Sequence, residues 1–179
     1  VRQLLVEHQH FNDPEKRMHI RHALERAIAQ NAIPIINYND PVSDEETRKF
    51  ELTELRRRND HVVECIDNDE TAAVVSDLMC SKYLLIMTST EGIYRDPTDS
   101  RTLVDEIRAD NVEACIEKIR AMQHCCVGTS RKGSGGAHAK LEFSIAPVRR
   151  GTVVLIAHAR HRISDILDGR VPHTRIGVY

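Results

Sequence analysis

The sequence predicts an α/β fold, a three-layer α/β/α sandwich with a mostly parallel central sheet. Short, continuously apolar runs at residues 83–87 and 153–157 are typical of strands that are buried on both faces of a parallel sheet. Helical patterns separate these runs, and alternation of strand and helix favours parallel strands joined by crossover helices. With 179 residues, 41% of them hydrophobic and none of them Trp, the chain is expected to form one domain with an aliphatic core.

Composition and charge exclude several classes of protein. A formal charge of −2 provides no basic excess for a nucleic-acid backbone, and no apolar run reaches membrane-spanning length. Five cysteines without CxxC spacing indicate reduced thiols, and His158 and His161 lack the Cys or carboxylate pattern that would complete a zinc site. We therefore expect a soluble, cytoplasmic protein that binds neither nucleic acid nor membranes.

The first part of the chain predicts a helix, a strand and a charged segment. Asn12, with Pro and Glu soon after it, resembles a helix cap and predicts a helix to about residue 30. Residues 33–36 predict a short buried strand with Pro at its start, and residues 4–6 are a weaker strand candidate. Residues 43–59 are dense in charge and predict either an exposed helix or a mobile insertion.

The remainder of the chain continues the alternation. A strand is predicted at 83–87 and another at 153–157, and residues 174–179 resemble a closing strand. Gly151 is expected to end the helix before the second of these strands. The predicted helices cover residues 71–80, 111–122, 137–149 and 163–167.

Polar clusters follow three predicted ordered segments. In an open α/β sheet, ligands bind beyond the carboxyl ends of the strands, so these positions are candidates for a site. The first two also have a purely structural explanation, as an Asn/Asp turn before Pro and as acidic residues that complement a helix dipole. The clusters contain Asn37 and Asp40; Asn68 and Asp69; and Thr88, Ser89, Gly92 and Tyr94.

A glycine-rich stretch at residues 131–140 is the strongest local signal. Its glycines let the backbone approach a ligand closely, and the helix start that follows adds partial positive charge. Lys140 adds a full charge. The stretch suits a phosphate group, although a flexible glycine turn before a helix would have the same composition. Its central residues are Ser134, Gly135 and Gly136.

Taken together and in this order, these clusters resemble the amino-acid kinase superfamily, and within it the kinase domain of the glutamate 5-kinases. The resemblance implies ATP and Mg²⁺ as cofactors, glutamate as the substrate and a homo-oligomer. It places Asp40, Asn68 and Asn37 at the substrate. Lys140 and Asp69 would be catalytic, with Asp69 organising the lysines, and no side chain would bind the metal directly because Mg²⁺ is carried with ATP. The implied ATP-binding residues are Thr88, Ser89, Gly92, Tyr94, Ser134, Gly135, Gly136 and Lys140.

The sequence also departs from the pattern of this superfamily. Ser89 stands where an Asp is usual, and Ala139 is one of the residues that replace Met and hydroxyl residues before Lys140. Residues 1–179 do not contain the family's first strand, with a catalytic Lys, or its Gly-Ser loop, and two explanations stay open: a piece of a longer protein, or a degenerate member that cannot turn over. The expected organisation is therefore a kinase domain over residues 1–179 without that strand and loop, with 43–59 as a charged insertion. Two alternatives stay open: another small-molecule kinase of the superfamily, or a non-catalytic nucleotide-binding regulatory homologue.

Overall fold

The structure is a computed structural model that describes residues 1–39, 45–58, 62–64, 68–126 and 136–179. The chain divides into two compact units, Val1–Val74 and Val75–Tyr179, which are described separately below. Among the described residues, three of the four strand pairs are parallel and one is antiparallel. Together with the intervening helices, this confirms the predicted α/β class.

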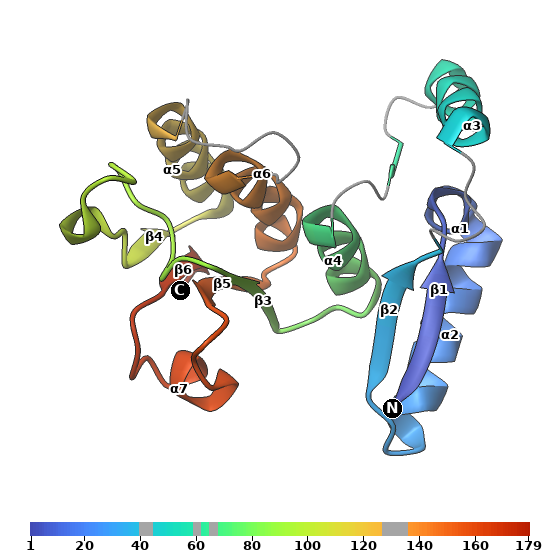
Figure 1. The fold of residues 1–179 in the computed structure, drawn as a ribbon, viewed down its shortest axis with the longest axis horizontal. Coiled ribbons are helices and arrows are strands. Elements are labelled where there is room, and N and C mark those ends of the chain that lie inside the picture. Colours follow the sequence, from blue (N-terminus) through green and yellow to red (C-terminus); the bar gives the residue numbers. More distant parts are fainter. Residues whose placement is uncertain (40–44, 59–61, 65–67, 127–135) are drawn as a thin grey trace. The chain divides into compact units, whose positions relative to one another are not determined.

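The first unit contains a strand–helix–strand motif (Figure 1). Strands β1 (Arg2–Val6) and β2 (Pro34–Tyr38) pair in parallel, and helices α1 (His8–Asn12) and α2 (Pro14–Ala29) connect them. Helix α2 contacts β2, and it buries Ile20, Leu24 and Ala27, which recur at the spacing of one helix face.

The start of α2 differs from the predicted cap by one residue. The side chain of Asp13, not that of Asn12, accepts the backbone N–H groups of Glu15 and Lys16. Asn12 instead donates its amide to the carbonyl of Val63 and accepts the Val63 N–H, at 2.7 and 2.9 Å. Two Asx-type residues stand side by side in the sequence, and only the contact with a segment 51 residues away distinguishes their roles.

The charged segment forms a helix over its described part. Helix α3 (Glu45–Arg58) buries Leu52, whereas Phe50 is 68% exposed. Glu51 lies 3.1 Å from the imidazole of the buried His8 at the start of α1. The helical alternative is therefore confirmed for residues 45–58, and the prediction that 43–59 is an insertion remains a prediction.

The Glu7 carboxylate provides a test of the first unit. It accepts the Asn39 amide at 2.8 Å and the Gln9 amide at 2.6 Å, and these hydrogen bonds lower the pKa of Glu7. A lowered folded-state pKa gives stability that is complete above the unfolded-state value, about 4.3, and that is lost as the pH falls through the folded-state value. In urea denaturation, the difference in unfolding free energy between wild type and Glu7→Gln should therefore be largest near neutral pH and shrink below about pH 4.

The Asn39→Ala background serves as the control for that measurement, because Asn39 makes the largest contribution to the lowered pKa. The pH dependence of the Glu7→Gln difference should be smaller in this background. A difference that stays constant between neutral and acidic pH would contradict the assignment.

The second unit is built on a four-stranded sheet. Its strands are β3 (Tyr83–Thr88), β4 (Glu106–Ala109), β5 (Val153–His158) and β6 (Thr174–Val178), in the spatial order β3-β5-β6-β4. The β3–β5 and β4–β6 pairs are parallel, whereas β5 and β6 are antiparallel. The two apolar strands predicted from the sequence are thus direct neighbours in the sheet.

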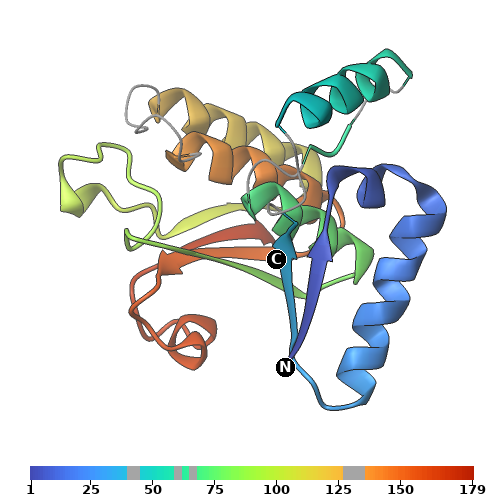
Figure 2. The same cartoon turned by 45° about the vertical axis from the view of Figure 1, so that its right-hand side comes forward.

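Helices cover both faces of this sheet (Figure 2). Helices α5 (Val112–Cys125) and α6 (Gly136–Arg149) pack against each other, and α6 contacts β5 and β6. On the other face, Ile166 of the short helix α7 (Ile163–Leu167) packs with Leu155 and Ala157 of β5. Because strand side chains alternate between faces, Val154 and Ile156 lie on the α6 side, and both are fully buried.

One strand was not predicted, and several helix and strand ends differ from the prediction. Strand β4 was not predicted, because it has only four residues and only Ile107 and Ala109 are buried. Helix α4 (Asn68–Leu78), which runs across the boundary between the units, begins three residues before the predicted start at 71. Other predicted features are confirmed, including the α7 range and the end of α6 before Gly151, which has a positive φ of 82°. Asn111 was predicted as the first helical residue, and its side chain instead caps α5.

The described cysteines are free thiols. Cys115 and Cys126 are buried, and burial raises the pKa of each thiol, whereas Cys80 and Cys125 are exposed. Two of these four cysteines are therefore part of the core. In the described part of the chain, no helix is both long and apolar enough to cross a membrane.

Candidate functional site

One edge of the second unit gathers several predicted site residues. Strands β3 and β5 run in parallel and end side by side, with Thr88 paired to His158. The Ala159 N–H donates to the Thr88 carbonyl at 2.8 Å, which continues the ladder by one bond beyond the strands. We call this edge, where β3 and β5 end, the β3–β5 rim.

Helix α6 starts toward the same rim. It contacts β5 and joins it through a turn of only three residues, 150–152, so the helix and the strand run in opposite directions. The 14 residues of α6 span about 21 Å and the six of β5 about 20 Å. The start of α6 therefore lies toward the end of β5, as the second unit in Figure 2 shows.

The α6 start has the features expected of a phosphate site. Gly136 adopts a positive φ of 44°, a conformation that side chains other than glycine rarely take. Lys140 follows one turn later and therefore stands on the same side of the helix. Free N–H groups at a helix start and a nearby ammonium group both attract an anion. Ser134 and Gly135 lie outside the described residues.

Gly92 has a structural role that is independent of any ligand. A Cβ atom at this position would lie 2.4 Å from the hydroxyl oxygen of Thr174 and 2.9 Å from its backbone nitrogen. The same hydroxyl accepts the buried Ile93 N–H at 2.8 Å. Glycine is thus required here so that the loop after β3 can approach the start of β6, and the ATP-binding role predicted for Gly92 remains a prediction.

The other residues predicted near the nucleotide lie along the same loop. Ser89 is exposed directly after β3, and Thr88 is partly buried at the strand end. Tyr94 is partly buried and forms an isolated antiparallel bridge with Leu103. The second unit therefore places Thr88 and Ser89 at the β3–β5 rim. The first turn of α6, with Gly136 and Lys140, lies toward the same rim.

The residues predicted to bind substrate belong to the first unit. Asn37 is an exposed residue of β2, one position before the strand ends. Asn68 and Asp69 are the first two residues of α4, where acidic side chains also complement the helix dipole. Glu70, next to them, accepts the Glu64 N–H at 3.1 Å, so part of this cluster holds the chain itself. Asp40 lies outside the described residues.

A cluster at the β3–β5 rim was not predicted as a site. The Glu91 carboxylate accepts the Arg160 guanidinium and lies 2.6 Å from His161 Nε2. The ring of His161 meets that of His158 edge-on, with centroids 6.2 Å apart. The sequence shows the spacing of the two histidines, but the carboxylate partner of His161 is 70 residues away. We call these four residues the Glu91 cluster.

Metal ligands are not grouped in the described part of the chain, where no set of three or more His, Cys, Asp and Glu side chains is arranged to hold an ion. Mg²⁺ as a cofactor therefore remains a prediction from the resemblance.

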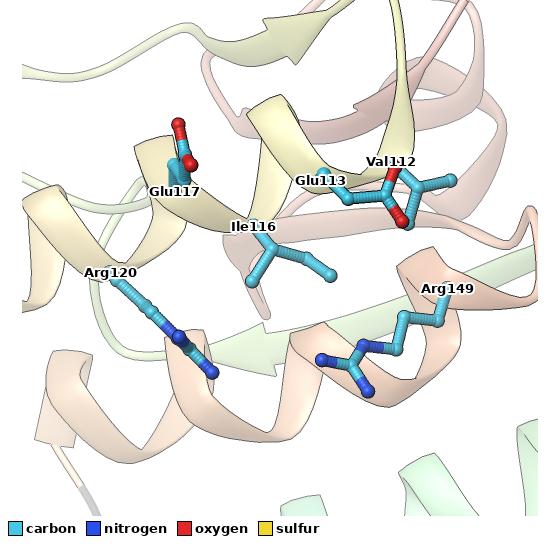
Figure 3. A pocket seen from close by; sticks show the side chains of 6 residues that line it. All are labelled: Val112, Glu113, Ile116, Glu117, Arg120 and Arg149. Carbon is cyan, nitrogen blue, oxygen red and sulfur yellow. The ribbon is translucent and has the colours of Figure 1, made fainter.

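A separate pocket of about 620 Å³ lies along α5 and the end of α6 (Figure 3). The guanidinium groups of Arg120 and Arg149 extend toward its middle below Ile116, while the Glu117 carboxylate points away from them. With Glu113, the lining contains two acidic and two basic side chains and so carries no net charge. None of the predicted site residues lines this pocket.

The fold and the β3–β5 rim define an α/β protein whose sheet edge and helix start suit a phosphorylated ligand. Residues 1–158 match the Amino acid kinase family, and the chain belongs to that family. The chain is similar to the glutamate 5-kinase of Deinococcus radiodurans, with 29% identity over 175 residues that cover 97% of this chain and 43% of that protein.

Other relatives have the same name. The glutamate 5-kinase of Shewanella oneidensis is 28% identical over 179 residues, which cover 100% of this chain and 42% of that protein. For the glutamate 5-kinase of Alkaliphilus metalliredigens the identity is 27%, over 94% of this chain and 57% of that protein. The chain thus spans about half the length of the relatives that it matches.

Solved structures show the same fold. A carbamate kinase from Giardia lamblia bound to AMP-PNP superimposes with a TM-score of 0.55 at 20% identity, over 89% of this chain and 44% of that one. A protein from Aeropyrum pernix gives a TM-score of 0.54 at 15% identity, over 89% of this chain and 45% of that one. At these identities the likeness concerns the fold alone.

Proposed function

We propose that the protein transfers the γ-phosphoryl group of ATP to the side-chain carboxylate of glutamate and forms glutamyl 5-phosphate, the first step of proline biosynthesis. The observation that carries this proposal is the similarity to glutamate 5-kinases along 97% of the chain. The α6 start supports the phosphate part of the reaction, because Gly136 and Lys140 provide backbone approach and positive charge.

The reaction requires electrostatic stabilisation of negative charge rather than proton transfer. A glutamate carboxylate is already ionised at neutral pH, so it attacks without a general base. Its oxygen forms a bond to the γ-phosphorus while the bond between that phosphorus and the bridging oxygen of ADP breaks. Two anions must approach each other, and positioned cations and N–H groups lower that barrier. In this proposal the Lys140 ammonium group stabilises the negative charge on the transferring phosphoryl group. Mg²⁺ carried with ATP would neutralise phosphate charge.

Other residues have supporting roles in the proposal. Thr88, Ser89 and Tyr94 contact the nucleotide together with Gly92, and residues 134–136 surround the phosphates. Asp69 organises the lysines, while the substrate amino and carboxylate groups are held by Asp40, Asn68 and Asn37. A cytoplasmic location and a homo-oligomeric assembly remain predictions from the sequence.

A substrate panel tests the proposed function. The full-length protein is incubated with Mg²⁺-ATP and, separately, glutamate, aspartate, N-acetylglutamate, a nucleoside monophosphate and isopentenyl phosphate. We expect ADP formation to depend on glutamate, and hydroxylamine to trap the acyl phosphate as a hydroxamate. Preference for another acceptor would assign the chain to a different kinase activity of the family. Nucleotide binding without ADP formation from any acceptor would favour a regulatory homologue, which the Ser89 and Ala139 departures also suggest.

A further inference from the structure

The Glu91 cluster joins two loops that the backbone ladder leaves separate. Both carboxylate oxygens of Glu91 are used, one by the Arg160 guanidinium and the other by His161 Nε2 at 2.6 Å. The side chains of Glu91 and His161 are each 16% exposed, so this contact is largely shielded from water. Shielded, charge-assisted hydrogen bonds are stronger and more directional than exposed ion pairs.

The loop after β5 is itself ordered around the same cluster. The Arg160 backbone N–H donates to His158 Nδ1 at 3.0 Å, and the His161 N–H donates to the His158 carbonyl at 3.1 Å. The edge-on ring contact with His158 fixes the His161 ring further. Glu91 is therefore bound by a loop that has little freedom of its own.

The loop after β3 is consequently held at both ends. At one end, Thr88 is paired to β5 through the Ala159 N–H. At the other end, Glu91 is bound by the cluster, and Gly92 packs against Thr174. Ser89 lies between these anchors and is exposed at the rim.

We propose that Glu91 is a positioning residue for the nucleotide, which acts by holding Thr88 and Ser89 at the β3–β5 rim in the conformation that binds ATP. The inference rests on the proposed function, in which these two residues contact the nucleotide. A loop that is ordered before binding does not lose that conformational freedom when the ligand arrives, and this increases affinity.

Glu91→Gln tests the proposal, because it removes the charge at nearly constant size. By calorimetry on the full-length protein, we expect ATP to bind about 2- to 10-fold more weakly, the range that corresponds to ordering one side chain. The KM for ATP should rise by a similar factor, while kcat at saturating ATP and the KM for glutamate change less than about twofold. His161→Gln should have a similar effect, and the two changes together should be less than additive.

Asp165→Asn is the matched control. It also converts a carboxylate bound to an arginine, Arg170 at 2.9 Å, into an amide in the same unit, but on α7 rather than at the rim. It should leave ATP affinity unchanged. Equal ATP affinity in wild type and Glu91→Gln would overturn the role of Glu91 but not the proposed function. An equal loss of ATP affinity in Glu91→Gln and Asp165→Asn would do the same. A wild type that binds ATP without phosphorylating glutamate would overturn the proposed function, and the ATP affinities would still decide the role of Glu91. A wild type that does not bind ATP would overturn both.

Discussion

Lys140→Ala is expected to lower the turnover of glutamate phosphorylation by about 10² to 10³, the usual effect of removing one preorganised donor from a developing charge. Lys140 stands one turn into α6, beside the helix start at Gly136. Its charge matters most when negative charge spreads over the transferring group, so kcat should fall more than the KM for ATP rises. Steady-state kinetics of the full-length protein with glutamate and ATP measure both quantities.

Lys82→Ala is the control for this experiment. Lys82 is an exposed lysine of the same unit that immediately precedes β3, at the opposite end of the strand from the rim. Lys82→Ala removes the same charge at a position away from the rim, so kcat and the KM for ATP of this variant should match those of wild type. Unchanged turnover in Lys140→Ala would remove Lys140 from the mechanism. An equal loss in Lys82→Ala would show that the effect depends on net charge.

Leu155→Ala is expected to destabilise the second unit by about 2 to 5 kcal/mol, the range for truncating a large buried aliphatic side chain. Leu155 is 1% exposed on the face of β5 that α7 covers, where it packs with Ile166 and Ala157. Truncation removes apolar burial and leaves a cavity that the central strand cannot easily close. Urea denaturation followed by circular dichroism measures the change in unfolding free energy.

Leu167→Ala makes the same chemical change at the end of α7, where the leucine is 38% exposed. It should cost clearly less than Leu155→Ala, because less apolar surface returns to water and little cavity forms. Similar losses for the two variants would contradict the packing of α7 on β5.

Elements with strong local signals could be predicted from the sequence. Strands β3 and β5 are continuous apolar runs, and both were found within one residue of their observed ends. Helix α5 begins within one residue of its predicted start at 111, and the Asn111 side chain caps it by accepting the Ala114 N–H at 2.9 Å. Strand β4 was missed because only two of its four residues are buried. A short edge strand has too few side chains to show the alternation of buried and exposed residues that identifies a strand.

The positions of the candidate site residues in the fold were predictable to a similar extent, whereas their roles remain predictions. The order of polar clusters along the chain pointed to the strand ends, and the structure places Thr88 at the end of β3 and Gly136 with Lys140 at the start of α6. The Glu91 cluster was not predicted, since Glu91 and its partners lie 69 and 70 residues apart in the sequence. Gly92 illustrates the same limit, because the reason for a glycine there is a threonine on another strand.

The sequence by itself determined most of the helices and strands and where several of them end, because these properties depend on residues within a few positions of one another. Only the tertiary structure decided that β5 and β6 are antiparallel, that Asp13 rather than Asn12 caps α2, and that Glu91 binds the loop after β5. Those outcomes depend on which distant groups come into contact when apolar surfaces pack. A local sequence pattern does not identify a partner that lies dozens of residues away.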